Sequence, residues 1–194
     1  MYYEKTYWEK QYQDQKTGWD IGYITPPIRE YIDQLTDKSI KILIPGAGNA
    51  YEAEYLIKKG FNNTFVLEFA DAPIENLLKR FPGFPTKNII KQDFFNFQGE
   101  YDLIIEHTFF SSIIPETREE YVTKAFELLK PSGKLVGLLF DRDFDNPFPP
   151  FGGNKKDYTE LFEQKFTIKK LETAYNSIKP RANNELFIIF EKNN

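Results

Sequence analysis

Residues 40–59 of the chain read IKILIPGAGNAYEAEYLIKK. The apolar, β-branched run at the start is short enough for a buried strand, and it breaks at Pro45-Gly46. After the break, apolar residues recur at helical spacing, at Ala53, Leu56 and Ile57. The stretch therefore predicts a strand, a glycine turn and a helix, and in an open α/β sheet such a turn lies at the ligand-binding carboxyl end of the strand.

The two glycines of the turn have a physical purpose. Gly46 and Gly48 lack a Cβ, so they can adopt positive φ and let a ligand approach the backbone, next to the unpaired N–H groups of the following helix. A third glycine is missing, because Ala50 and Tyr51 occupy the candidate places, and the dinucleotide fingerprint is incomplete. The turn alone is consistent both with a cofactor site and with an ordinary strand-to-helix connection.

Composition narrows the class of protein. The chain has 194 residues, a net charge of -4, no cysteine and one histidine, His107. This length suits one domain, and the scattered lysines form no basic nucleic-acid footprint. Without cysteine, and with one histidine, a thiolate or histidine-rich metal centre is not expected. The N-terminus lacks the apolar core of a signal peptide, and no apolar run approaches the ~20 residues that span a bilayer. We expect a cytoplasmic protein that binds no metal, nucleic acid or membrane.

Strands and helices alternate along most of the chain. An amphipathic helix is predicted over residues 2–12, a second helix begins at Pro26 or Pro27, and further helices follow over 72–81 and 116–129. Strands are predicted up to residue 44 and over 64–69, 88–91, 101–106 and 134–140. This alternation predicts a parallel, doubly wound sheet with right-handed crossovers.

The last third of the chain departs from the alternation. Residues 141–154 are rich in Asp, Pro, Phe and Gly and predict a long ordered loop, followed by a short helix over 158–162. Residues 166–171 and 185–191 flank a polar, proline-containing turn region, as a terminal antiparallel pair of strands would.

Four segments, in this order, carry a resemblance to a known family. They are Trp8-Glu9-Lys10 with Trp19-Asp20-Ile21-Gly22 and Thr25-Pro26; Leu43-Ile44-Pro45-Gly46-Ala47-Gly48; Asp93-Phe94-Phe95; and Glu106-His107-Thr108-Phe109-Phe110 with Ile113, Pro115, Arg118 and Tyr121. A weaker echo is Pro147-Phe148-Pro149-Pro150-Phe151. Together they resemble class I S-adenosylmethionine-dependent methyltransferases, in particular the branch that contains thiopurine S-methyltransferase and the plant halide and thiol methyltransferases.

The resemblance implies a fold and a methyl donor. It implies a single methyltransferase domain over residues 1–194, in which residues 1–36 cover cofactor and substrate. The fold would be Rossmann-like, with a mostly parallel seven-stranded sheet and a C-terminal antiparallel hairpin. The donor would be S-adenosylmethionine, released as S-adenosylhomocysteine, the acceptor would be a small molecule, and a monomer is favoured over an oligomer.

The resemblance also assigns the cofactor-binding residues. Gly46 and Gly48 would pass close to the methionine part, and Glu68 would accept hydrogen bonds from the ribose hydroxyls. The remaining contacts would come from Asp93 to the adenine amine, Phe69 and Phe94 to the ring faces, Trp8 and Trp19 over the methionine end, and the backbone around Glu106 to the amino group. The residues themselves support Glu68 most, because an acid that ends an apolar strand is poorly placed in a core. Asp93 could instead be a turn residue or cap, the two phenylalanines core residues, and the two tryptophans anchors of the N-terminus.

His107 is the predicted catalytic residue. It follows the fourth predicted strand, beside the sulfonium in the family's geometry. By the resemblance, the matching position holds an arginine in the thiopurine branch and a tyrosine in the plant branch. An imidazole that titrates near ~6.5 could take the proton of an acceptor thiol or orient its anion. Aromatic residues would form the rest of the substrate pocket with His107: Tyr23, Phe109, Phe110, Phe148 and Phe151.

These observations lead to one functional hypothesis and two alternatives. The hypothesis is an S-adenosylmethionine-dependent S-methyltransferase that transfers a methyl group by in-line displacement to a thiol, sulfide, thiocyanate, halide or thiopurine. A nicotinamide-dependent oxidoreductase could use the same glycine turn, although the missing third glycine argues against it. A catalytically silent protein that only binds S-adenosylmethionine is the other alternative, because His107 differs from both branches.

Overall fold

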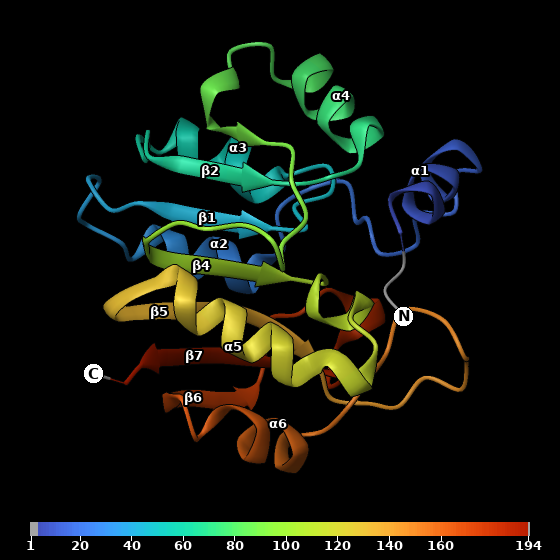
Figure 1. Cartoon of the computed structure of the whole chain (residues 1–194), viewed down its shortest axis with the longest axis vertical. Helices are drawn as coiled ribbons and strands as arrows, with labels where there is room; N and C mark the ends of the chain where they lie inside the picture. The colour runs from blue at the N-terminus through green and yellow to red at the C-terminus, as the bar shows by residue number, and fades with distance from the viewer. Residues whose placement is uncertain (1–3, 194) are drawn as a thin grey trace.

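The computed structural model describes residues 4–193, which form one seven-stranded sheet with helices on both faces (Figure 1). The strands are β1 Ile42–Pro45, β2 Thr64–Leu67, β3 Ile89–Ile90, β4 Tyr101–His107, β5 Leu129–Phe140, β6 Phe166–Thr173 and β7 Glu185–Lys192. Their order across the sheet is β3-β2-β1-β4-β5-β7-β6. The first five strands pair in parallel, and β7 is antiparallel to β5 and β6. The predicted doubly wound sheet with a terminal antiparallel pair is confirmed.

The described part of the chain also contains six α-helices and four short 3-10 helices. The α-helices are α1 Lys5–Gln13, α2 Pro26–Asp33, α3 Tyr51–Lys58, α4 Asp71–Arg80, α5 Arg118–Leu128 and α6 Lys155–Phe162. The 3-10 helices are η1 Thr86–Asn88, η2 Phe110–Ser112, η3 Pro115–Thr117 and η4 Lys179–Arg181. The start of α2 at Pro26 is as predicted, because the first helical turn does not need the N–H that proline lacks. Residues 2 and 3 of the first predicted helix lie outside the described residues.

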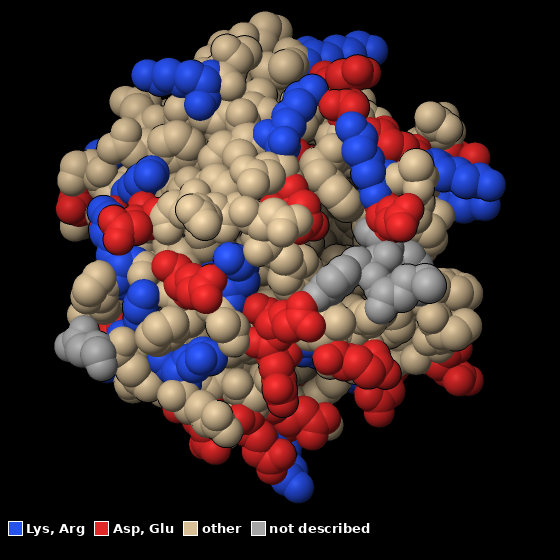
Figure 2. All heavy atoms as spheres, viewed as in Figure 1, with Lys and Arg blue, Asp and Glu red and all other residues tan. Residues whose placement is uncertain are grey.

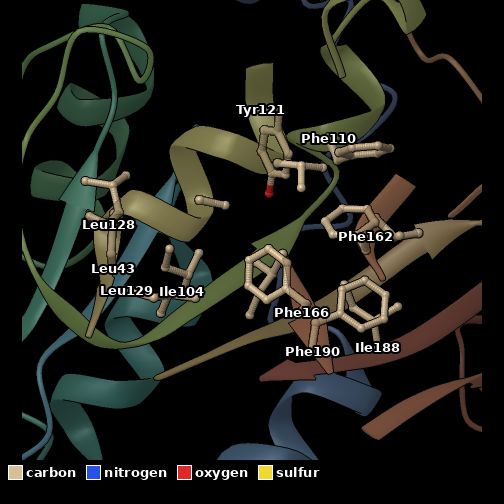
Figure 3. Close-up of a cluster of buried hydrophobic side chains, with 14 of the residues drawn as sticks. Leu43, Ile104, Phe110, Tyr121, Leu128, Leu129, Phe162, Phe166, Ile188 and Phe190 are labelled. Atoms are coloured by element: carbon tan, nitrogen blue, oxygen red, sulfur yellow. The ribbon is translucent and has the colours of Figure 1, made fainter. Parts of the chain in front are cut away.

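The central strands send alternate side chains to opposite faces of the sheet. Leu43 and Ile104 point into an aromatic-rich core beneath α5 and α6 (Figure 3). Ile42 and Leu103 point into the opposite core, which α2, α3 and α4 cover. Because successive residues of a strand alternate between faces, a strand with both faces covered needs apolar residues throughout. This is why the short run that ends at Pro45 is entirely buried.

β7 lies between β5 and β6 and runs opposite to the parallel strands. Its first residue is therefore at the same edge of the sheet as the carboxyl ends of β1, β2 and β4. The connection between β6 and β7, which contains η4, returns to this edge. Residues from the last part of the chain are thus brought to the predicted ligand-binding end.

The fifth strand is longer than the sequence predicts. β5 begins at Leu129 instead of residue 134, and α5 ends at Leu128 because Leu129 already has extended backbone geometry. Leu129 pairs with Tyr101, and the register shifts between Tyr101 and Leu103 on the partner strand. The irregularity lets the chain enter the sheet early through Lys130-Pro131-Ser132-Gly133, residues that read as a turn in the sequence.

The surface carries charges of both signs. On the face seen in Figure 2, acidic side chains gather in the lower half of the view. Helix α5 has three exposed glutamates, Glu119, Glu120 and Glu127. Lysine and arginine side chains are scattered among them. Within residues 4–193, no helix has the length and apolar character that crossing a bilayer requires.

Candidate active site

A cavity of about 930 Å³ opens at the carboxyl edge of the parallel strands. Its wall combines the turn after β1, the ends of β2 and β4, the N-terminal segment, the loop after β5 and η4. In Figure 1 the arrowheads of β1, β2 and β4 point toward α1 and this loop. Glu68 and Asp93, which follow different strands, both line the cavity. A volume of this order is typical of small-molecule sites, so one ligand can reach both carboxylates.

The glycine turn forms part of the cavity wall in left-handed backbone geometry. Gly46 and Gly48 have φ values of +53° and +52°, a region that favours residues without a Cβ. A Cβ on Gly46 would lie 2.1 Å from Cδ2 of Phe109, so the phenyl ring rests directly on the glycine. The turn thus needs glycine both for its dihedral angles and for the close approach of an aromatic ring.

Glu68 is held at the end of β2 by backbone hydrogen bonds. Its Oε2 accepts the N–H of Gly48 and its Oε1 accepts the N–H of Ala70, each at 2.9 Å. The side chain is only 7% exposed, and this burial raises the pKa of the carboxyl group, against the opposing effect of these N–H groups. A carboxylate has about four acceptor sites, so both oxygens can accept a further hydroxyl. This arrangement fits the vicinal hydroxyls of a ribose.

Asp93 and the phenylalanines near it combine structural and cavity-lining positions. Asp93 Oδ1 accepts the N–H groups of Phe95 and Asn96 at 3.0 and 3.2 Å. These bonds close a turn, which is the structural role that the sequence offered for Asp93 as an alternative to adenine binding. Phe94 is stacked on the buried Tyr121 with ring centroids 5.2 Å apart. Asp93, Phe94 and Phe69 also line the cavity. The three residues predicted to bind adenine therefore line the same cavity.

The N-terminal segment is anchored over the cavity by α1. Trp8 and Trp19 line the cavity and pack edge to face, with centroids 5.4 Å apart. Glu9 accepts the N–H of Asp71 at 2.5 Å and so caps the first turn of α4, where a negative charge is favourable. Lys5 also forms an ion pair with Asp71. The two tryptophans are thus both anchors of the segment and part of the cavity wall.

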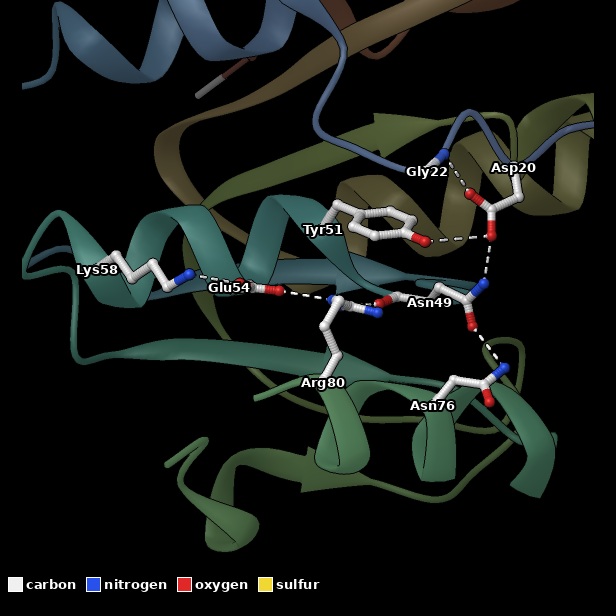
Figure 4. Close-up of polar contacts among 8 residues, drawn as sticks. All are labelled: Asp20, Gly22, Asn49, Tyr51, Glu54, Lys58, Asn76 and Arg80. Atoms are coloured by element: carbon white, nitrogen blue, oxygen red, sulfur yellow. Dashed lines mark hydrogen bonds and ion pairs between the residues drawn. The ribbon is translucent and has the colours of Figure 1, made fainter. Parts of the chain in front are cut away.

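A network of polar side chains ties the loop after α1 to the glycine turn (Figure 4). Asp20 accepts the N–H of Gly22 at 2.7 Å, the side-chain amide of Asn49 and the hydroxyl of Tyr51 at 3.4 Å. Arg80 donates to the carbonyl of Asn49 at 2.5 Å. Asp20 itself lines the cavity, so the loop is fixed at the cavity entrance from both α3 and α4.

His107 belongs to a buried cluster of polar and charged groups that lines the same cavity. Its Nδ1 lies 2.9 Å from Glu52 Oε1 of α3, and its Nε2 lies 3.2 Å from Nη1 of Arg181 in η4. Arg181 also approaches Glu185 Oε1 at 3.3 Å and donates from Nη2 to the carbonyl of Trp19 at 2.7 Å. Glu52, His107 and Arg181 line the cavity. Arg181 thus connects β4, β7 and the N-terminal segment.

Glu52 and Arg181 were not predicted from the sequence. Glu52 is an acid in the first turn of the helix after the glycine turn, where it also suits the helix dipole, and such acids are common. Arg181 lies in a polar turn that gave no motif. The available signal was topological: an antiparallel pair after a parallel strand returns its connecting turn to the carboxyl edge, so any charged residue in that turn was a candidate.

Glu106 lies beside His107 but does not line the cavity. Because neighbouring strand residues face opposite sides, His107 points toward α3 and Glu106 toward α5. Glu106 Oε2 accepts the hydroxyl of Tyr121 at 2.6 Å, and Oε1 accepts the N–H of Phe110 at 2.8 Å. The carboxylate is completely buried. Its contacts fix the backbone after β4, where His107 and Phe109 reach the cavity.

The buried Glu106 should make stability depend on pH. Burial raises its pKa to about 7, despite the hydrogen bond from Tyr121. As pH rises from the ordinary glutamate value of ~4.3 to about 7, the unfolded chain releases a proton that the folded chain keeps, so the free energy of unfolding falls. This fall in the free energy of unfolding is on the order of 3 kcal/mol in total, and Glu106→Gln should remove it. Urea unfolding at pH 5 and pH 8 measures it, and an unchanged pH dependence in the variant would contradict the assignment.

Two residues that were predicted to line the substrate pocket do not line the cavity. Phe110 is buried in the core beneath α5 and α6, in contact with Tyr121 and Tyr158, and is not part of the cavity wall. Phe151 is also absent from the wall; its N–H donates to the carbonyl of Ser111 at 2.7 Å and its carbonyl accepts from Arg118 at 3.1 Å. An aromatic residue can be recognised in a sequence, but the direction in which its ring points cannot.

The other predicted pocket residues do line the cavity. Phe109 packs on Gly46, and Tyr23 and Phe148 stand at the rim, each 53% exposed. Tyr23 comes from the N-terminal segment, Phe109 from the turn after β4 and Phe148 from the loop after β5.

Comparisons with known proteins agree with this geometry. The fold is similar to a solved Burkholderia thailandensis 1,6-didemethyltoxoflavin-N1-methyltransferase with bound 1,6-didemethyltoxoflavin and S-adenosylhomocysteine, with a TM-score of 0.77 and 16% identity over 98% of this chain and 87% of that chain. Probable thiol methyltransferase 2 of Arabidopsis thaliana is 27% identical over 79% of this chain and 70% of its own length. Thiocyanate methyltransferase 1 of Brassica oleracea is 28% identical over 74% of this chain, which spans 66% of that protein.

The sheet order and these neighbours define the class I methyltransferase fold, as the resemblance implied. A sequence model of the thiopurine S-methyltransferase family matches residues 3–193, so the chain belongs to that family. The protein is therefore an S-adenosylmethionine-dependent methyltransferase with S-adenosylmethionine as its methyl donor. Family membership selects this function over the oxidoreductase and the silent binding protein.

Proposed function

We propose that this methyltransferase acts on a small soft nucleophile: a thiol, sulfide, thiocyanate, halide or thiopurine. The observation that carries the proposal is one cavity that joins Glu68 and the glycine turn to the His107 cluster. The names of the thiol and thiocyanate methyltransferases to which the chain is similar support the same class of acceptor.

The cofactor end of the site uses fixed backbone and carboxylate groups. S-adenosylmethionine supplies, when bound, a methyl group on a positively charged sulfur. We assign Gly46 and Gly48 to the methionine part, Glu68 to the ribose hydroxyls and Asp93 with Phe69 and Phe94 to adenine. The available acceptor sites of Glu68 and the shared wall support these roles. The side chain of Glu106 does not reach the cavity, so its contribution is the geometry of the chain after β4.

The acceptor end is enclosed mainly by aromatic side chains. In-line displacement requires that nucleophile, methyl carbon and leaving sulfur be aligned and that water be excluded. Trp8 and Trp19 of the segment predicted over residues 1–36 cover the cofactor end, while Phe109, Tyr23 and Phe148 surround the acceptor. Aromatic faces also favour a nearby cationic sulfur. His107 is the polar residue that was predicted from the sequence for the acceptor end.

The acceptor class is tested by a panel of alkyl and aryl thiols, sulfide, thiocyanate, iodide and thiopurines with labelled methyl donor. We expect at least one sulfur or halide acceptor to be methylated with saturation kinetics. Phenols and amines of similar size are the matched controls, and we expect slower transfer to them. Efficient transfer to these oxygen and nitrogen nucleophiles, with none to sulfur or halide, would overturn the proposal.

A further inference from the structure

The hydrogen bonds of His107 determine which of its ring nitrogens carries the proton. A guanidinium can only donate, so at 3.2 Å from Nη1 of Arg181 the Nε2 atom must accept. Glu52 accepts at the other nitrogen, Nδ1, at 2.9 Å. These two contacts fit the tautomer that carries its proton on Nδ1 and directs the Nε2 lone pair at Arg181.

Charged groups from three directions hold this arrangement. Glu52 faces the ring from α3 and Arg181 from η4, while Glu185 of β7 holds Arg181 from behind. Glu106 is adjacent in β4 and points to the opposite face, where Tyr121 and the N–H of Phe110 occupy it. Glu52, Arg181 and Glu185 are all buried. Moving Arg181 away from Nε2 would also break its bond to the carbonyl of Trp19.

From this geometry we infer that Glu52 is a positioning residue, which fixes His107 as the Nδ1–H tautomer so that His107 binds Arg181 and does not deprotonate the acceptor. The inference rests on the proposed function for its consequence in catalysis. A thiol acceptor would lose its proton to solvent before it reacts. The thiolate lone pair then forms the new carbon–sulfur bond as the bond between methyl and sulfonium breaks, and that electron pair stays on the leaving sulfur. No proton passes to His107.

The tautomer can be observed directly because the chain has one histidine. In the full-length protein labelled with ¹⁵N-histidine, the imidazole correlation spectrum at pH 7 should show a protonated Nδ1 and an unprotonated Nε2. A spectrum of the Nε2–H tautomer or of the imidazolium would overturn the inference. This measurement requires no substrate, so it succeeds or fails independently of the acceptor class.

Substitution of Glu52 separates a positioning role from a structural one. Glu52→Gln keeps an oxygen that accepts the Nδ1 proton, so the tautomer should be retained. Glu52→Leu removes the group that holds Nδ1, so the ring can turn and present either nitrogen to Arg181. This should give a mixture of tautomers, with transfer reduced roughly tenfold to a hundredfold through misplacement of His107 and Arg181. Glu127→Leu, an exposed carboxylate on α5, is the control and should match the wild type. If the leucine variant is unfolded, the glutamine variant still decides: loss of the Nδ1–H tautomer in it would contradict the role.

The pH dependence of transfer tests the catalytic consequence. We compare kcat/KM for an alkyl thiol, which ionises near ~8.5, and a more acidic aryl thiol. If the thiolate forms in solution, the rise of kcat/KM should occur near the pKa of each free thiol and therefore at different pH for the two. A rise at one common pH for both thiols, lost in His107→Gln, would show that His107 is the base and would overturn the inference. Absence of transfer to any sulfur or halide acceptor, with the expected tautomer, would instead reject the proposed acceptor class and leave the assignment of Glu52.

Discussion

Replacement of Glu68 by alanine is expected to weaken S-adenosylmethionine binding by roughly tenfold to a hundredfold, the loss that follows when hydrogen bonds to a charged group are removed. The carboxylate is buried at the cavity wall and still has acceptor sites beyond its bonds to Gly48 and Ala70. Isothermal titration with S-adenosylmethionine measures the effect. His107→Ala should differ: it should leave cofactor binding intact and reduce transfer.

Two further variants make the Glu68 result interpretable. Glu68→Gln retains one acceptor oxygen for the backbone and should bind with intermediate affinity. Glu75→Ala changes an exposed glutamate of α4 that does not line the cavity, and should bind like the wild type. Unchanged affinity in both Glu68 variants, or a binding defect in His107→Ala with none in Glu68→Ala, would reject the division of roles between the two ends of the cavity.

Gly46→Ala should damage both stability and cofactor binding. A residue with a Cβ is strained at φ +53°, and the new methyl group would lie 2.1 Å from the ring of Phe109. The left-handed geometry costs about 1–2 kcal/mol, and displacement of the ring toward the cavity adds to it. We expect a midpoint of thermal unfolding lower by about 4–8 °C and a weaker cofactor affinity. Calorimetry and titration measure the two effects.

Gly18→Ala is the matched control for the effect of this substitution on stability. Gly18 has no heavy atom within 4 Å of its ideal Cβ position and no positive φ. Its variant should unfold at or slightly above the wild-type temperature, because alanine restricts the unfolded chain more than glycine does. Equal behaviour of the two alanine variants would mean that the turn after β1 does not require glycine.

Most of the fold could be predicted because its signals are local. The run that ends at Pro45 is apolar on both faces, as a central parallel strand must be. Helix α2 was marked by its prolines, and the alternation of elements determined the parallel sheet. The start of β5 was not predicted, because Pro131 and Gly133 indicate a turn locally, whereas pairing of Leu129 with Tyr101 keeps the chain in the sheet.

The candidate site was predicted where a residue ends a strand and missed where it depends on direction or on distant pairing. Glu68 lines the cavity as expected. An acidic residue that ends an apolar strand is unfavourable in a core, so it faces the cleft or solvent. Phe110 was misplaced, because an aromatic side chain is equally at home in a core, and the sequence after β4 does not reveal which way each ring points. Glu52 and Arg181, which are far apart in the chain, each contact His107. The sheet order brings them to that residue, and no local pattern in the sequence indicates it.

The position of β7 has a consequence for how this enzyme acquires its activity during folding. The Arg181 guanidinium holds the carbonyl of Trp19, a contact between residues 162 positions apart. Such distant contacts form late, because closing a long loop costs entropy before any pairing offsets it. A newly synthesised chain can thus pair its first five strands and still lack the hydrogen bond between Arg181 and Trp19. We therefore expect activity to appear only after β7 has paired with both β5 and β6.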